Sequence, residues 1–206
     1  MSSEKRQGNL IVVVAPSGGG KTTLCHAVID RLPGIRFSVS HTTRPARGDE
    51  VDGVAYHFVD RDEFQRMIDR EALVEWAQIH GHYYGTSHTE IENARRNGED
   101  IFLDIEGQGA MQIRARYPDA VLVYILPPSM EVLRERLRAR GTDSEDEVER
   151  RCENARREIE FIHDFDYVII NDELEAAVTT LEAIVRAGRQ RRENMRDAIA
   201  RYLTTP

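Results

Sequence analysis

Cysteine is scarce in this sequence, and long apolar runs are missing. The 206 residues include two cysteines, Cys25 and Cys152, whose separation matches no metal-site spacing. Such a pair favours buried, reduced thiols over a disulfide framework. The apolar run Leu10–Val14 is too short for the core of a secretion signal, and a membrane span needs about 20 apolar residues. We therefore expect a cytoplasmic protein that has no membrane partner.

Positive charge is also in short supply. The chain has 28 Lys and Arg against 36 Asp and Glu, which gives a net charge of −8 near neutral pH. A general nucleic-acid binder usually carries net positive charge, so we expect no nucleic-acid partner. An anionic ligand would need a local cluster of positive side chains. The length and the 40% of hydrophobic residues are typical of one compact domain with an insertion or two.

Most of the positive charge comes from arginine. Lys5 and Lys21 are the only lysines among the 28 basic residues. Lys21 lies in APSGGGKTT, which follows the buried-strand pattern LIVVV and precedes a helical pattern. This context fits a phosphate-binding loop, in which glycines let backbone N–H groups face phosphate oxygens. Ala15 replaces the first glycine of the motif, at a position that ends a strand and needs no positive φ. An ordinary glycine-rich turn before a helix is the alternative.

Apolar patterns along the chain alternate between strand and helix. Continuous apolar runs predict strands at 10–14, 101–105, 121–126 and 167–170, and helical spacing separates them. This alternation is typical of an α/β fold with a parallel sheet and right-handed crossovers. Between 35 and 88, short strand-like pieces and repeated glycines surround one helix, which indicates a β-rich insertion. The predicted helices cover about 22–32, 61–71, 90–96, 109–117, 130–139 and 144–163, with a long one from 174 onward.

Seven segments, in this order along nearly the whole chain, resemble the guanylate kinase family and its bacterial members in particular. They are APSGGGKTT, SVSHTTRPARGDEVDGVAYHFV, EWAQIHGHYYGTS, FLDIEGQGA, ILPPS, RLRARGTDSE and VIIND. The resemblance implies a three-layer P-loop α/β fold with a parallel core sheet, a β-rich GMP-binding insertion and a helical lid. The implied bounds are 8–36, 89–137 and 156–206 for the core, 37–88 for the insertion and 138–155 for the lid.

The resemblance implies that the glycine loop holds the phosphates of ATP together with Mg²⁺. Lys21 would reach the β- and γ-phosphates, and the Thr22 hydroxyl would ligate the metal. The residues implied to bind ATP are Ala15, Pro16, Ser17, Gly18, Gly19, Gly20, Lys21, Thr22, Thr23, Arg136, Asn171 and Asp172.

Three arginines of the charged segment 134–158 match lid positions of the family. Arg140 and Arg151 would cover the phosphates and stabilise the charge that is transferred, while Arg136 would lie nearer the adenine. The alternative for such a charged run is a solvated helix face with ion pairs along it. The pair 171–172 matches an adenine-side loop, and its alternative is a turn with a helix cap.

A second group of side chains matches the family's acceptor-phosphate site. Arg44 and Arg47 lie three apart in a predicted loop, and two guanidinium groups can bind one phosphate through several charge-assisted hydrogen bonds. By resemblance, Ser40, Tyr56 and Tyr84 complete this site. Taken alone, the arginines would more often be solvated surface residues and the tyrosines packing residues.

Guanine recognition is implied by a third group. A carboxylate can accept from guanine N1–H and N2–H₂, and a hydroxyl can donate to O6, a pattern that adenine reverses. Glu75 matches the guanine-binding carboxylate, and Thr86, after Gly85, matches a hydroxyl position. Asp104 and Glu106 lie two apart, so on an extended strand they would face the same way, with Asp104 holding Mg²⁺ through water. The alternative for Glu106 is a helix cap.

The resemblance implies Mg²⁺-dependent, in-line transfer of the ATP γ-phosphoryl group to GMP in purine nucleotide metabolism. Lys21, Arg44, Arg140 and Arg151 would be the catalytic residues. One alternative is a related binding module that has lost catalysis, and another is a P-loop kinase with a different acceptor. The basic segment 186–196 is predicted to be a solvated terminal helix, with a contact between identical subunits as the alternative.

Overall fold

The computed structural model describes residues 6–139, 141 and 144–204. Its main sheet has five parallel strands in the order β2 (Ile35–Phe37), β7 (Asp100–Asp104), β1 (Leu10–Val14), β8 (Val121–Leu126) and β9 (Tyr167–Ile170). All five residues of β1 are buried, because this strand is paired on both sides and covered on both faces. The predicted α/β fold with a parallel core sheet is confirmed.

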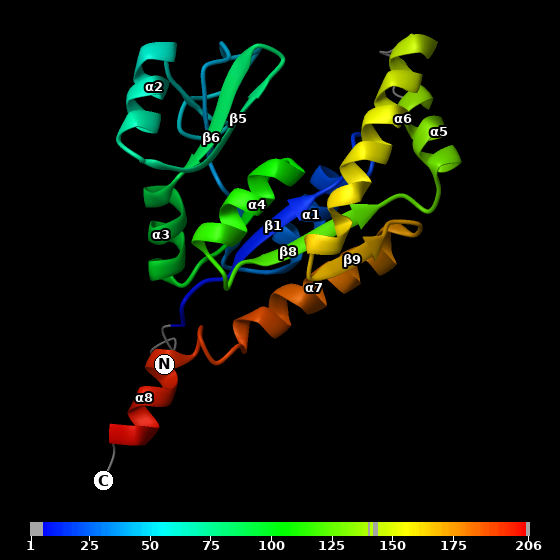
Figure 1. The fold of residues 1–206 in the computed structure, drawn as a ribbon. Coiled ribbons are helices and arrows are strands. Elements are labelled where there is room, and N and C mark those ends of the chain that lie inside the picture. The colour runs from blue at the N-terminus through cyan, green and yellow to red at the C-terminus, as the bar shows by residue number, and fades with distance from the viewer. Residues whose placement is uncertain (1–5, 140, 142–143, 205–206) are drawn as a thin grey trace.

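Helices cover both faces of the main sheet (Figure 1). On one face, α1 (Lys21–Arg31) and α7 (Leu174–Arg189) pack against side chains such as Val13 and Ile169. On the other face, α3 (His88–Asn97) and α4 (Gly107–Arg116) pack against side chains such as Val12. Alternate residues of β1 therefore belong to two different hydrophobic clusters, as the two-residue period of a strand requires.

A second, four-stranded sheet rises from the edge of the main sheet (Figure 1). Its order is β4 (His57–Phe58), β3 (His41–Thr42), β6 (His82–Ser87) and β5 (Leu73–Ile79), and α2 (Arg61–Asp69) packs on it through Phe64 and Met67. The hairpin of β5 and β6 turns at His80 and Gly81, which both have positive φ, as a tight two-residue turn requires.

Two helices form an arm on the other side of the molecule (Figure 1). These are α5 (Met130–Ala139) and α6 (Glu145–Ile159), followed by a 3₁₀ turn, η1 (Glu160–Asp164). They share a small apolar core that includes Leu137 of α5 and Cys152 of α6. Outside this core, Arg134 pairs with Glu149 and Arg138 pairs with Glu145, so part of the charged run is a solvated, ion-paired face.

The helix expected to continue from residue 174 is interrupted. The chain turns after Gln190, and α8 (Arg196–Thr204) extends away from the body (Figure 1). The Asn194 amide donates to the Gly188 carbonyl at 2.8 Å and to Asn9 Oδ1 at 2.6 Å. This buried side chain thus satisfies a carbonyl at the end of α7, which replaces continuation of the helix. In the described part of the chain, no helix combines the length and apolar character needed to cross a membrane.

A buried carboxylate ties the chain ends to the main sheet. Asp100, at the start of β7, is fully buried and accepts hydrogen bonds from both Nη atoms of Arg6, from Arg189 Nε at 2.6 Å and from the Asn9 backbone N–H at 2.8 Å. Four donors compensate for burying this charge. Because Arg189 lies in α7, this one carboxylate joins the N-terminal segment, the sheet and the C-terminal part of the chain.

We expect Asp100→Ala to lower the free energy of unfolding by about 3 kcal/mol, because two guanidinium groups lose their buried partner. Chemical denaturation measures this loss. Asp30→Ala, at an exposed position of α1, is the control and should change stability by less than about 0.5 kcal/mol. A loss at Asp100 as small as that of the control would contradict this role.

Candidate functional site

The glycine loop lies between β1 and α1, as its sequence context predicts. Gly18 and Gly20 have φ of 91° and 89°, so both use the left-handed conformation that favours glycine. Ala15 is not among the described non-glycine residues with positive φ, so alanine suffices where the motif has its first glycine. The loop lines a hollow of about 310 Å³, which we call the phosphate hollow. Its lining residues are Val14, Ala15, Pro16, Ser17, Gly18, Gly20, Lys21, Thr22, Thr23, Ile105, Glu106, Gly107 and Glu158.

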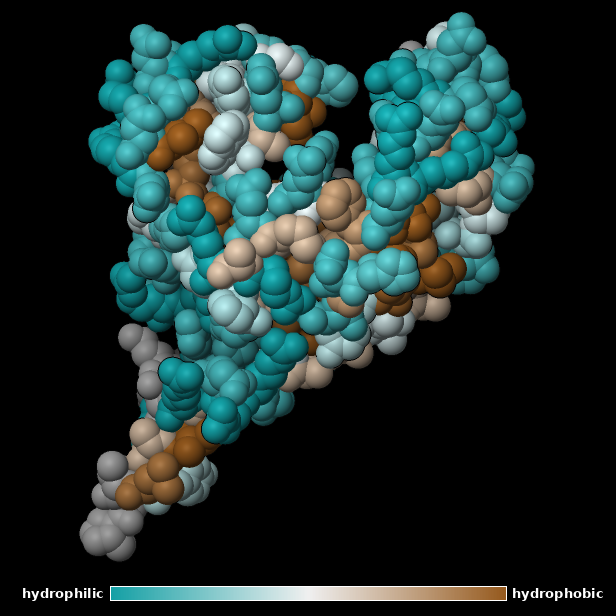
Figure 2. All heavy atoms as spheres, viewed as in Figure 1, coloured by the Kyte–Doolittle hydropathy of each residue, from teal (hydrophilic) through white to brown (hydrophobic). Residues whose placement is uncertain are grey.

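A second hollow of about 310 Å³, the acceptor hollow, adjoins the first. It is lined by Lys21, Ser40, Tyr56, Glu75, Ala77, Ile79, Tyr84, Gly85, Asp104, Ile105, Glu106 and Gly109. Lys21, Ile105 and Glu106 line both hollows, so the two spaces meet beside the only lysine of the loop. Figure 2 shows this region as a notch between the lobe of the second sheet and the α5–α6 arm.

Lys21 is held at the junction of the two hollows. Its ammonium group pairs with the carboxylate of Asp104 and donates to the Ile105 carbonyl at 3.4 Å. Asp104 is opposite Val13 in the register of β7 and β1, so parallel pairing brings this acid to the end of the sheet where the loop begins. The sequence predicted both residues for this site, and the ion pair between them comes from the pairing of the strands.

Glu75, at the wall of the acceptor hollow, is buried, with 4% of its surface exposed. Its Oε1 accepts a hydrogen bond from the Thr86 hydroxyl at 2.7 Å. Burial raises the pKa of Glu75 to about 7, the bonds from Thr86 oppose this shift and the nearby Glu106 adds to it. A Cβ on Gly109 would lie 2.9 Å from Glu75 Oε2, so a side chain on this residue of α4 would displace that carboxylate oxygen. The proton of Thr86, expected to face a guanine O6, is directed to Glu75 in this structure.

Glu106 is not on a strand. β7 ends at Asp104, and Glu106 is the N-cap residue of α4, so the two acids do not share one strand. The backbone at Glu106 is still extended, and both side chains line the acceptor hollow. The Glu106 side chain makes no capping hydrogen bond, so the helix-cap alternative is not observed. Sequence reasoning missed Glu158 of α6, which lines the phosphate hollow and whose pKa is raised by burial and by Glu106.

Arg44 is buried rather than solvated. Its Nη atoms donate to both carboxylate oxygens of Glu50 at 3.0 and 2.9 Å, and its guanidinium carbon lies 5.3 Å from the centre of the Tyr56 ring. The hydrogen bonds to Glu50, with a smaller contribution from Tyr84, raise the pKa of Arg44. Glu50 Oε2 also accepts the backbone N–H of Arg47, whose own side chain is exposed. The solvated-surface alternative therefore fits Arg47 and is wrong for Arg44.

Sequence reasoning missed Glu50, which connects the two predicted phosphate-binding arginines. The available signal was an acid three residues after Arg47 in a turn-rich segment, a pattern that many surface loops share. Only the tertiary structure shows that its carboxylate is bidentate to a buried guanidinium, which fixes the plane of that group.

The arm reaches the glycine loop through its arginines. Arg151 donates to the Ser17 hydroxyl at 3.3 Å, and Arg136 donates to the Asn171 carbonyl at 2.8 Å. The Asn171 amide in turn donates to the Gly19 carbonyl at 2.9 Å. The N-cap residue of α7 is Glu173. Residues 171–172 therefore do not cap this helix, and the helix-cap alternative does not apply there. Arg140 lies outside the described residues.

Oxygen atoms suited to a hard divalent cation lie beside Lys21, because Thr22 lines the phosphate hollow and Asp104 lines the acceptor hollow. The Thr22 hydroxyl and the Asp104 carboxylate are of the type that Mg²⁺ prefers. In the described ranges, no three His, Cys, Asp or Glu residues gather closely enough to hold a metal by themselves. This donor set fits a Mg²⁺ that is held in part by ligand phosphates, which is how this ion usually binds in nucleotide sites.

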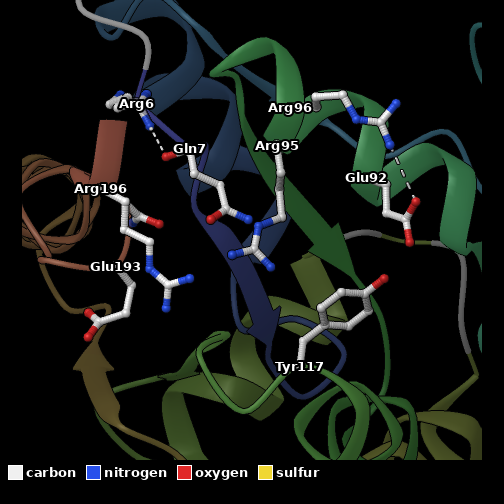
Figure 3. Close-up of a pocket in the computed structure, with 9 residues that line it drawn as sticks. Arg6, Gln7, Glu92, Arg95, Arg96, Tyr117, Glu193 and Arg196 are labelled. Carbon is white, nitrogen blue, oxygen red and sulfur yellow. Dashed lines mark hydrogen bonds and ion pairs between the residues drawn. The ribbon is translucent and has the colours of Figure 1, made fainter. Parts of the chain in front are cut away.

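A separate hollow of about 360 Å³ lies beside the N-terminal segment, and Figure 3 shows the guanidinium of Arg95 pointing into it between Gln7 and Tyr117. Its deepest arginine is already paired, because Arg95 donates to the Gly8 carbonyl at 3.1 Å and binds Asp119. Arg6 is likewise bound to the buried carboxylate of the fold. None of the residues predicted for ATP or GMP lines this hollow.

The chain is similar to known proteins over most of its length. The family model described as guanylate kinase matches residues 7–188. The guanylate kinase of Aromatoleum aromaticum is 48% identical over 195 residues, covering 95% of this chain and 96% of that protein. The guanylate kinase of Desulfitobacterium hafniense is 45% identical, covering 89% and 92%. The crystal structure of guanylate kinase from Anaplasma phagocytophilum is 32% identical, with a TM-score of 0.73 over 92% of this chain and 90% of that one.

We expect Glu75→Gln to stabilise the unliganded protein increasingly as the pH rises from 5 to 8. The pKa of this carboxyl is about 7 in the folded state and about 4.3 in an unfolded chain, so its ionisation costs stability across that window. Glutamine keeps the acceptor for Thr86 and does not ionise. Thermal unfolding at pH 5 and pH 8 measures the effect, and an equal difference from wild type at both pH values would contradict it.

Proposed function

The chain belongs to the guanylate kinase family and is therefore a nucleoside monophosphate kinase, and we propose that it transfers the γ-phosphoryl group of ATP to GMP, with dGMP as a second acceptor. The single observation that carries this proposal is the meeting of the phosphate hollow and the acceptor hollow at Lys21. Two adjoining spaces that share one ammonium group suit a donor and an acceptor whose phosphates must come together.

On the donor side, the loop N–H groups and the α1 N-terminus would bind the ATP phosphates. Lys21 would leave Asp104 for the β- and γ-phosphates, and Arg151, already at Ser17, would reach the same oxygens from the arm. Arg140 would assist as part of the lid, and 171–172 with Arg136 would lie on the adenine side.

On the acceptor side, Arg44 would bind the GMP phosphate, with Arg47, Tyr56, Tyr84 and Ser40 around it. This role is supported by the rigid Arg44–Glu50 pair and by the hollow that Ser40, Tyr56 and Tyr84 share.

The guanine would lie against the buried end of the acceptor hollow. Glu75 and Glu106 would accept from N1–H and N2–H₂, because both carboxylates line that space. Thr86 would hold Glu75 through the hydrogen bond it already donates, and Gly85 would leave room for the base. Adenine offers no matching donors at these positions, so the buried Glu75 carboxylate would lose the ligand partner that guanine supplies.

Mg²⁺ is the cofactor of this proposal, and Thr22, with Asp104 through water, would hold it. The ion supplies positive charge against the phosphate oxygens of the donor. The chain's own part is to bind and orient the two phosphates in line, with no covalent enzyme intermediate. Closure of the insertion 37–88 and the lid 138–155 over the core segments would exclude water from the reacting groups.

In the cell, we propose that the protein works in the cytoplasm, in purine nucleotide metabolism. Its negative net charge favours small-molecule ligands over nucleic acid. A contact between identical subunits through the basic segment 186–196 stays a prediction.

The decisive experiment measures ADP release with Mg²⁺ and ATP against GMP, dGMP, AMP, CMP and UMP. We expect turnover with GMP and dGMP, and a loss of at least about a hundredfold in Lys21→Ala with an unchanged circular dichroism spectrum. Absence of turnover with every acceptor would favour a binding module without catalysis. Turnover with AMP but not with GMP would refute the guanine assignment.

Glu50→Gln should raise the KM for GMP about tenfold and leave the KM for ATP unchanged. The amide would replace one charge-assisted acceptor of Arg44 by a donor that faces it, so the guanidinium would lose its fixed plane, at a cost of about 1–2 kcal/mol. The control is Asp49→Asn, the same exchange at the exposed neighbouring position. Equal changes in both KM values, or a tighter KM for GMP, would exclude this positioning role.

A further inference from the structure

The strand that carries Glu75 changes register just before this residue. On β5, Leu73 pairs with Ser87 of β6. The next pair is Glu75 with Thr86, so β5 advances by two residues while β6 advances by one. Val74 is therefore an extra residue, and such a β-bulge re-aims the side chains near it. Beyond the bulge, alternate side chains of β5 line the acceptor hollow: Glu75, Ala77 and Ile79.

The bulge residue joins β5 to the hydrophobic core of the main sheet. Val74 is buried in the cluster that includes Ile113 of α4, whereas Leu73 belongs to the cluster of the second sheet. Along this stretch α4 packs against β5 (Figure 1). The part of β5 that leads into Glu75 is therefore held by a helix of the main sheet, although the strand itself belongs to the second sheet.

One side of α4 follows β5. Glu106, Gly109 and Gln112 are spaced by three residues along this side. Glu106 lines the acceptor hollow, and Gly109 lies directly beside the Glu75 carboxylate. Gln112 Oε1 accepts the Trp76 backbone N–H at 3.3 Å, and Gln112 Nε2 donates to the Trp76 carbonyl at 3.4 Å. Because β5 is the edge strand of its sheet, this amide takes the place of a neighbouring strand.

The two carboxylates of the acceptor hollow that are assigned to guanine come from different parts of the molecule. Glu75 is on β5, and Glu106 is at the start of α4. Glu106 adds to the burial that raises the pKa of Glu75, so the two groups repel each other when both are ionised. Their separation depends on what holds β5 against α4, and Gln112 does so through the backbone of the residue next to Glu75.

We propose that Gln112 is a positioning residue for guanine recognition, which holds the edge of β5 on α4 and so fixes the Glu75 carboxylate relative to that of Glu106. This inference rests on the proposed function, in which the two carboxylates accept from guanine N1–H and N2–H₂. A base with two neighbouring donors gains from both acceptors only when their spacing matches the spacing of the donors. Loss of the Gln112 hydrogen bonds would therefore weaken a ligand with both donors more than a ligand with one.

The test compares GMP with inosine 5′-monophosphate (IMP), which keeps N1–H and lacks the 2-amino group. Gln112→Met keeps the length of the side chain and removes both hydrogen bonds. For this variant we expect the Kd for GMP, measured by calorimetry, to rise about tenfold and the Kd for IMP to rise about twofold, on the scale of one to two hydrogen bonds. The KM for ATP should stay within about twofold of the wild-type value.

The control is Gln65→Met, the same exchange at an exposed position of α2. The Gln65 side chain also makes a hydrogen bond, to Asp69 at 2.9 Å, and it lies on the helix that covers the second sheet. This variant should leave the affinities for GMP and IMP unchanged. Gln112→Ala removes the same two hydrogen bonds with a smaller side chain and should show the same selective loss of GMP binding, so it answers the question if the methionine variant does not fold.

Equal weakening of GMP and IMP would mean that Gln112 only supports the fold, and it would overturn the proposal. Unchanged binding of both ligands would overturn it as well. Wild-type protein that phosphorylates GMP but binds IMP equally tightly would refute this inference and leave the proposed function standing. Wild-type protein that transfers no phosphate to GMP would refute the proposed function itself, and this inference with it.

Discussion

The position of β1 at the centre of a parallel sheet is the constraint on which the rest of the site depends. Because β1 pairs with β7 on one side and β8 on the other, the ends of three strands meet where the glycine loop begins. The same pairing brings Asp104 beside Lys21, and it places the residue after β9, Asn171, behind the loop. A strand buried on both faces leaves little freedom for displacement, so the loop has a rigid base.

In this acidic protein, three of the cationic side chains assigned to the phosphates are each paired with a nearby acid. Lys21 pairs with Asp104, Arg44 with Glu50, and Arg151 with Glu147 at 3.4 Å. These acids orient the positive groups without a ligand, and an incoming phosphate, with its higher charge, competes for the same donors. This arrangement reconciles a net charge of −8 with the proposed site for two phosphorylated nucleotides.

The two hollows differ in how much they are formed before any ligand binds. The acceptor hollow has a buried, hydrogen-bonded wall in Glu75 and Thr86, and its arginine is already fixed by an acid. The floor of the phosphate hollow is the glycine loop. Its cover comes from α6, where Arg151 donates a hydrogen bond to the Ser17 hydroxyl of the loop at 3.3 Å. The acceptor hollow thus has hydrogen-bonded walls, whereas the cover of the phosphate hollow contacts the loop through Arg151. This difference is consistent with a lid that opens for exchange of nucleotides.

The sequence by itself determined the regular elements and the chemistry of single residues. Periodicity and the glycine motif predicted β8 at 121–126, α5 at 130–139 and the loop at Lys21, because these depend on neighbours along the chain. The tertiary structure decided which side chains meet and where each element ends, for partners six positions apart as well as for distant ones. It buried Arg44 against Glu50, turned the Asn171 amide to Gly19 and placed Glu106 at the start of a helix. It also ended α7 where Asn194 meets Asn9. These contacts join residues up to 185 positions apart, and local pattern has no access to such pairings.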